Sequence, residues 1–99
     1  MNNNIFNDIR DWAEVRGIYE KGDVKTQTLK LVEEAGELSK AVLNQNQEEI
    51  IDAIGDCVVV LTNLAHLADT SIEQCMELAY NVISERKGEM INGTFVKEQ

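Results

Sequence analysis

The feature that most constrains the fold of this sequence is a pair of acids inside its most apolar stretch. Over residues 48–68, aliphatic side chains would cover nearly every face of a helix, which predicts a central helix with neighbours all round. Asp52 and Asp56 lie in this stretch, about 40° apart on such a helix, and Asn63 continues the same stripe. Because buried charges need a partner or a counter-ion, another element has to meet this stripe.

A second helix, predicted from about residue 23 to residue 43 with Asp23 as its N-cap, carries three further acids. Within "KLVEEAGELSKAV", Glu33, Glu34 and Glu37 share about one third of the helix circumference. Leucine, valine and alanine side chains form an apolar face on the same helix. This helix therefore has to bury apolar surface close to its acids.

The short polar connection "NQNQ" (44–47) predicts that these two helices pack antiparallel. Counted outward from it, Glu37 and Glu34 stand at about the levels of Asp52 and Asp56. Four or five carboxylates would then converge, and their repulsion would require protonation or a bound cation. A hard divalent ion suits such oxygen ligands, Mg²⁺ best, with Mn²⁺ as a second candidate. The alternative is that the acids form solvated helix faces, as acidic clusters on helices commonly do.

The rest of the chain predicts two more helices and a short tail, and it contains no proline that would interrupt them. These elements are, in chain order, a helix over 4–17 ended by Gly17, a loop in "GIYEKGD", a helix from Thr70 or Ser71 to about Arg86 or Lys87, and a turn with an extended tail at "NGTFV" (92–96). We expect an all-α fold with a single domain over residues 1–99. It would be a four-helix bundle completed by oligomerisation, as a dimer or a dimer of dimers, because the helix over 48–68 is apolar all round.

Charge and composition narrow the choice of partners. Nine basic against eighteen acidic residues give a net charge of −9, which disfavours nucleic-acid binding and allows nucleotide binding only through metal ions. The first residues lack the basic and apolar regions of a signal peptide, and the apolar run 57–68 is too short and too polar to span a bilayer. Cys57 and Cys75 are interpreted as free thiols of a reducing compartment. We expect a cytoplasmic protein with no nucleic-acid or membrane partner.

The paired acidic motifs resemble those of the MazG family of all-α nucleoside triphosphate pyrophosphohydrolases, especially its short single-domain members. "QTLKLVEEAGELSKAV" (27–42) is similar to the EExxE motif of that family, and "DAIGDCVVVLTNLA" (52–65) is similar to its second acidic motif. "WAEVRG" (12–17) and "RKGEMINGTFVK" (86–97) look like its flanking segments. One departure is that the second motif is usually ExxD; its Glu would fall on Ala53, and this chain offers Asp52 instead.

The resemblance implies cleavage between the α- and β-phosphates of a nucleoside triphosphate, which gives a monophosphate and pyrophosphate. It also implies Mg²⁺ dependence and an active site partly formed by a second subunit. Glu34, Glu37 and Asp56 are then the metal ligands, with Asp52 as a fourth. Glu33 is either a further ligand or the base that orients the attacking water, so all five acids are candidate catalytic residues.

Five other residues are candidates for contact with the substrate. Lys30 could contact a phosphate or simply pair with Glu34, and Asn63 could contact base or ribose or be a buried, hydrogen-bonded amide. Trp12 could stack on the base or belong to the core. Arg86 and Lys87 could hold the outer phosphates across a subunit boundary, or serve only as charges at a helix C-terminus. The sequence leaves the preferred base and sugar open.

Other functions compete with hydrolysis. A non-catalytic acidic binding protein, such as a mimic of DNA charge, explains the net charge but not acids inside apolar helices. A degenerate MazG-like module that binds nucleotides without cleaving them is compatible with the displaced acid of the second motif. A di-iron bundle is disfavoured because the chain has no Glu-x-x-His pair.

Overall fold

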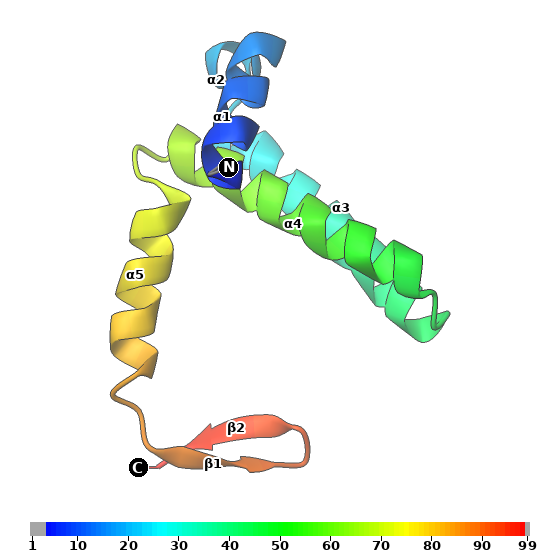
Figure 1. Ribbon diagram of the computed structural model, residues 1–99, viewed down its shortest axis with the longest axis vertical. Helices are drawn as coiled ribbons and strands as arrows, with labels where there is room; N and C mark the ends of the chain where they lie inside the picture. Colours follow the sequence, from blue (N-terminus) through cyan, green and yellow to red (C-terminus); the bar gives the residue numbers. More distant parts are fainter. Residues whose placement is uncertain (1–3, 99) are drawn as a thin grey trace.

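The computed structural model describes residues 4–98, which form five helices followed by a two-stranded hairpin (Figure 1). The mainly helical chain predicted from the sequence is confirmed. The elements are, in chain order, α1 (Ile5–Arg16), α2 (Ile18–Lys21), α3 (Val24–Leu43), α4 (Gln47–Leu67), α5 (Ile72–Ile83), β1 (Gly88–Ile91) and β2 (Thr94–Lys97).

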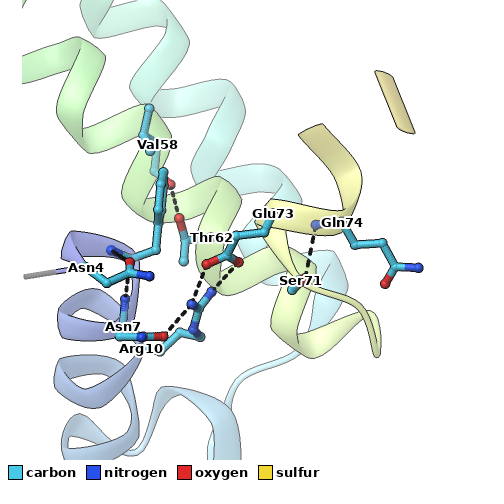
Figure 2. Close-up of polar contacts among 9 residues, drawn as sticks. Asn4, Asn7, Arg10, Val58, Thr62, Ser71, Glu73 and Gln74 are labelled. Atoms are coloured by element: carbon cyan, nitrogen blue, oxygen red, sulfur yellow. Dashed lines mark hydrogen bonds and ion pairs between the residues drawn. The ribbon is translucent and has the colours of Figure 1, made fainter. Parts of the chain in front are cut away.

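The longer helices begin where a polar side chain satisfies a free backbone N–H. The Asp23 carboxylate accepts a hydrogen bond from the Thr26 N–H at 2.7 Å, as the sequence predicted for α3. Of the two candidate caps for α5, the structure selects Ser71, whose Oγ accepts from the Gln74 N–H at 3.1 Å (Figure 2). Gly17 ends α1 with a positive φ of 83°, a conformation that glycine adopts without steric cost.

The structure differs from the predicted elements in three places. Part of the expected loop 17–23 is the short helix α2, which Gly22 ends by donating its N–H to the Ile18 carbonyl at 2.8 Å. Helix α5 stops at Ile83, earlier than predicted. The extended tail is a full antiparallel hairpin, in which Asn92 and Gly93 both have positive φ, as a tight turn between strands requires. The Glu98 N–H also bonds to the Lys87 carbonyl at 2.7 Å, which holds residues next to β1 extended and out of the helix.

Helix α4 is the centre of the molecule. It lies alongside α3 as the second arm of a helical hairpin (Figure 1), and it also contacts α1, α2 and α5. Small residues allow this close approach, since Ala41 of α3 and Ala53 of α4 are both buried. The core is otherwise modest, and Ile51 and Ile54 on α4 remain at least half exposed. The predicted central helix is therefore confirmed, but one chain does not cover all of its faces.

The C-terminal arm, which we define as residues 72–97, extends away from this helical hairpin (Figure 1). Among residues 4–98, α5 packs only on α4, and the β1–β2 hairpin packs on no other element. The radius of gyration is 16.0 Å, whereas a compact chain of this length has about 13 Å. The four-helix bundle expected from the sequence is thus not closed within a single chain.

One ion pair ties the start of this arm to α1. Arg10 donates to both carboxylate oxygens of Glu73, at 2.9 and 2.7 Å, and its guanidinium also donates to the Asn7 Oδ1 at 2.6 Å (Figure 2). The Arg10 side chain hydrogen-bonds to Glu73 and thereby lowers the pKa of Glu73 and raises that of Arg10. This fork fixes the first turn of α5 while leaving its remainder free.

By length and composition alone, helix α4 could span a membrane. The run 57–68 is too short for this, but the whole helix has 21 residues. Central helices of globular proteins meet the same test. Asp52 and Asp56 interrupt the apolar surface of α4 on the side that faces α3.

Candidate functional site

A polar cavity of about 300 Å³ opens between α3 and α4. Three of the predicted site acids line it: Glu37 from α3, and Asp52 and Asp56 from α4. Ala41 and Ala53, which are both buried, also line it. The antiparallel register predicted from the connection 44–47 therefore brings acids of both helices to one place. We call this space the acidic cavity.

Glu34 is the most unusual of these acids because it is buried. Its residue surface is only 8% exposed, and among residues 4–98 its Oε2 is the one fully buried side-chain oxygen or nitrogen without a hydrogen-bond partner. Its Oε1 lies 3.9 Å from the Lys30 Nζ. Burying a carboxylate oxygen without a hydrogen-bond partner is costly, so this atom indicates a place where a cation or donor would be stabilised.

The electrostatics of the cavity agree with this interpretation. When Glu34 is protonated, its carboxyl can hydrogen-bond to Glu37, and this raises the pKa of Glu34 most; burial and the charges of Glu37 and Asp56 add to the effect, while Lys30 lowers it. The pKa of Asp56 is raised chiefly by burial and then by Asp52 and Glu37. Both carboxyl groups thus hold protons more tightly than isolated acids, because they are partly removed from water and lie beside other carboxyl groups.

Glu33 and Lys30 lie at the solvent side of this cluster. The Lys30 Nζ is 3.6 Å from the Glu33 Oε1, so the lysine bridges Glu33 and Glu34 on one face of α3. Both Lys30 and Glu33 are exposed. Lys30 therefore pairs with Glu34, which is one of the two roles considered for it. Its contact with a phosphate stays a prediction.

The acids are gathered but not arranged as a finished metal centre. Within residues 4–98, no three His, Cys, Asp or Glu side chains stand close enough together to hold a metal ion as they are. Glu37 and Asp52 are exposed and free to change rotamer, whereas Glu34 is fixed by its burial. Convergence of four or five carboxylates, as the sequence predicted, would need rotation of these exposed side chains.

The sequence analysis missed two residues that line the acidic cavity, Lys40 and Glu49. Glu49 lies about 20° from Asp56 around α4, so the angular criterion that selected Asp52 also selects it. Lys40 follows Glu37 by three residues and therefore lies on a neighbouring part of the α3 surface. It brings a positive charge into the cavity that the sequence analysis did not consider.

Asn63 is buried and engaged within the protein. Its Oδ1 accepts a hydrogen bond from the Tyr19 hydroxyl at 2.7 Å, and the Tyr19 ring stacks on His66 with the ring centroids 3.8 Å apart. Burial raises the pKa of Tyr19 above its usual value. This cluster attaches α2 to α4. Asn63 is therefore a buried, hydrogen-bonded amide, which is one of the two roles considered for it.

Trp12 is not a core residue, since 46% of its surface is exposed. The Arg16 guanidinium lies over its ring, 5.2 Å from the centroid. Trp12 lines a second, more apolar cavity of about 330 Å³ between α1 and α4 together with Asp8, Ile9, Asp56 and Val59. Asp56 therefore belongs to both cavities.

Arg86 and Lys87 lie in the segment that joins α5 to the β1–β2 hairpin, far from the α3–α4 pair within the same chain (Figure 1). Both are exposed, and Arg86 lines a cavity at the base of the hairpin with Tyr80, Ile83 and Phe95. Their own chain does not bring these cations to the acidic cavity, which agrees with the expectation of a contact across a subunit boundary but does not test it.

Comparison with known families agrees with the acid pattern on α3 and α4. The sequence model of the MazG nucleotide pyrophosphohydrolase domain matches residues 23–91, well over half of the chain. The chain belongs to the MazG family. The match begins at the N-cap of α3 and contains every acid of the site described above, whereas α1 and α2 lie outside it.

Among curated proteins, this MazG-family chain is similar to an uncharacterised 18.2 kDa protein from the rep–hol intergenic region of Haemophilus phage HP1. The two are 41% identical over 61 residues, which is 62% of this chain and 37% of the phage protein. The chain thus spans little more than a third of the length of that relative. No solved structure matches it significantly.

Proposed function

We propose that this MazG-family protein is an Mg²⁺-dependent nucleoside triphosphate pyrophosphohydrolase that cleaves between the α- and β-phosphates of an NTP or dNTP. The observation that carries the proposal is the buried Oε2 of the Glu34 carboxylate, which has no hydrogen-bond partner, beside a cavity lined by acids of two helices. The family match to a nucleotide pyrophosphohydrolase domain supports the same chemistry. We further propose that the protein acts in the cytoplasm.

The donor set fits Mg²⁺ better than a softer metal. All the candidate ligands are carboxylate oxygens, which Mg²⁺ prefers, and no histidine or cysteine lines the acidic cavity within the described part of the chain. Neighbouring carboxylates contribute to the raised pKa values of Glu34 and Asp56, and a dication would neutralise their charge. Mn²⁺ has similar ligand preferences and is the expected substitute.

In this proposal Glu34, Glu37 and Asp56 hold the metal, with Asp52 as a fourth ligand. When bound, the metal neutralises phosphate charge and polarises a phosphoryl oxygen. Glu33, on the solvent side of Glu34, either adds a ligand or orients the attacking water and takes its proton. Water then adds to the α-phosphorus, and the bond from that phosphorus to the bridging oxygen breaks to release pyrophosphate.

Positive charges for the triphosphate come from two sources in this proposal. Lys30, next to Glu34, and Lys40, in the cavity wall, belong to the same chain. Arg86 and Lys87 would come from a second copy in a homo-oligomer, because their own arm points away from the cavity (Figure 1). The exposed apolar side chains of the arm support such an assembly, among them Leu78, Val82 and Ile83.

A panel of ribo- and deoxyribonucleoside triphosphates with Mg²⁺ tests the proposal. We expect release of pyrophosphate with the matching monophosphate, and loss of activity when EDTA removes the metal. Release of orthophosphate alone would mean that a different bond is cut. Binding of triphosphates without turnover would favour the degenerate nucleotide-binding module, and neither binding nor turnover would favour an acidic binding protein.

A further inference from the structure

The second cavity, between α1 and α4, has the composition of a site for a flat organic ring. Ile9, Val59 and the exposed indole of Trp12 give it apolar walls, and its volume of about 330 Å³ lies at the lower end of the range for small-molecule sites. Asp8 adds one exposed carboxylate from α1. We call this cavity, lined by Asp8, Ile9, Trp12, Asp56 and Val59, the α1–α4 groove.

Its position connects it to the proposed phosphate site. Asp56 lines both the acidic cavity and the α1–α4 groove, so the two spaces lie on either side of one side chain. A nucleotide whose phosphates occupy the acidic cavity would therefore have its base within reach of the groove. One side of the Trp12 ring is already taken by Arg16, 5.2 Å from the centroid, which leaves the other for stacking.

We propose that the α1–α4 groove binds the base of the substrate and that Asp8 selects bases that present hydrogen-bond donors, guanine first. This inference rests on the proposed function for the position of the phosphates. An ionised carboxylate only accepts hydrogen bonds, and its two oxygens match two adjacent N–H groups. Guanine offers such a pair at N1 and N2, and adenine and cytosine offer one amino group. Thymine and uracil flank their single N–H with carbonyl oxygens, which the carboxylate repels.

The inference assigns a role to a segment outside the family match. Residues 23–91 contain the acids of the phosphate site, whereas Asp8 and Trp12 lie in α1. Helix α1 is held in place on its other side by the fork between Arg10 and Glu73, so its Asp8 side is presented to α4 without depending on a ligand. Base selection would thus be separable from the phosphate chemistry.

Fluorescence of Trp12 tests this directly, because it is the only tryptophan of the chain. We expect dGMP with Mg²⁺ to quench its emission and to bind at least about tenfold more tightly than dTMP, with dIMP, which lacks the 2-amino group, in between. In Asp8→Asn the preference of dGMP over dTMP should fall below about threefold. Asp11→Asn, an exposed acid of α1 outside the groove, is the matched control and should keep the wild-type preference.

Equal binding of dGMP and dTMP to the wild type would overturn the inference, and so would an unchanged preference in Asp8→Asn. The inference would also be overturned if nucleotides left the fluorescence of Trp12 unchanged while the fluorescence shifted with protein concentration, since a second copy of the chain would then cover the groove. The readout needs no turnover. Selective quenching without any hydrolysis would count against the proposed enzyme while leaving the base site intact.

Discussion

The helical hairpin of α3 and α4 encloses an acid, whereas the C-terminal arm leaves most of its residues exposed. The hairpin buries a carboxylate that has no partner for one oxygen, although it has surface available for its acids. The arm exposes large apolar side chains, although burial would stabilise it, and Leu78 is 61% exposed. The hairpin therefore lacks a positive charge for its buried carboxylate, and both regions leave apolar side chains uncovered, since Leu29 of α3 is 70% exposed as well.

This difference explains what each part is for in the proposed enzyme. The unfavourable charge in the hairpin is useful only if a dication and a triphosphate relieve it. The exposed apolar faces of the arm are useful only if a second copy covers them, and the arm would then bring Arg86 and Lys87 to the neighbouring site. Variants in the two regions should consequently have distinct effects.

The largest effect is expected from Glu37→Gln in the acidic cavity. The change removes a proposed ligand while keeping the side-chain shape, so turnover should fall at least about 100-fold. Because Glu37 is exposed, the fold should be retained, as circular dichroism would verify. Glu77→Gln, an exposed acid on α5, is the control and should keep full activity. Equal activity of the two variants would contradict the proposed role of Glu37 as a metal ligand.

The next effect concerns the arm. Leu78→Glu and Val82→Glu place charge on one exposed face of α5 and should convert the proposed oligomer to a monomer, as light scattering after size-exclusion chromatography would report. Asn81→Glu adds the same charge at an exposed position that is already polar and should leave the assembly intact. A wild-type protein that is already monomeric at micromolar concentration would contradict the role given to the arm.

A smaller effect is expected on stability from Glu34→Gln. The folded protein holds the Glu34 proton more tightly than the unfolded chain, so ionisation of Glu34 destabilises the fold above the folded pKa. This penalty declines as the pH falls through the folded pKa and is absent below 4.5, the ordinary pKa of a glutamate in an unfolded chain. Without metal, the variant should be more stable than the wild type at pH 7 and similar to it at pH 4, in urea unfolding. Lower stability of the variant at pH 7 would contradict the proposed strain.

The smallest effect is expected from Glu73→Gln, which breaks the fork to Arg10. The pair lies near the surface, so the loss at pH 7 should be about 1 kcal/mol. The folded pKa of Glu73 is lowered, so its contribution to stability is present above the ordinary glutamate pKa of 4.5 and is lost as the pH falls through the folded pKa. The wild type and the variant should thus converge in stability at low pH. A constant difference at all pH values would indicate that packing, and not charge, makes the contact.

The fold and the site were predictable from the sequence to different degrees. Periodicity placed α1, α3, α4 and α5, and the angular positions of Glu37, Asp52 and Asp56 brought them to one cavity, because helix geometry is local. Helix α2 was missed because a helix of four residues depends on tertiary contacts. The early end of α5 was missed because cross-strand contacts of the hairpin compete with the helix for residues 86–87. The burial of Glu34 alone among its neighbours was also beyond sequence reasoning, because it depends on the rotation of α3 against α4.

The most direct test of the central claim is a magnesium titration of thermal stability at pH 7 in the wild type and in Glu34→Gln. The account predicts that Mg²⁺ raises the midpoint of the wild type in a saturable way and has little effect on the variant, because the stabilisation comes from a metal bound at Glu34. An equal response of both proteins to Mg²⁺, or no saturable response of the wild type even with a triphosphate present, would contradict a metal site between α3 and α4.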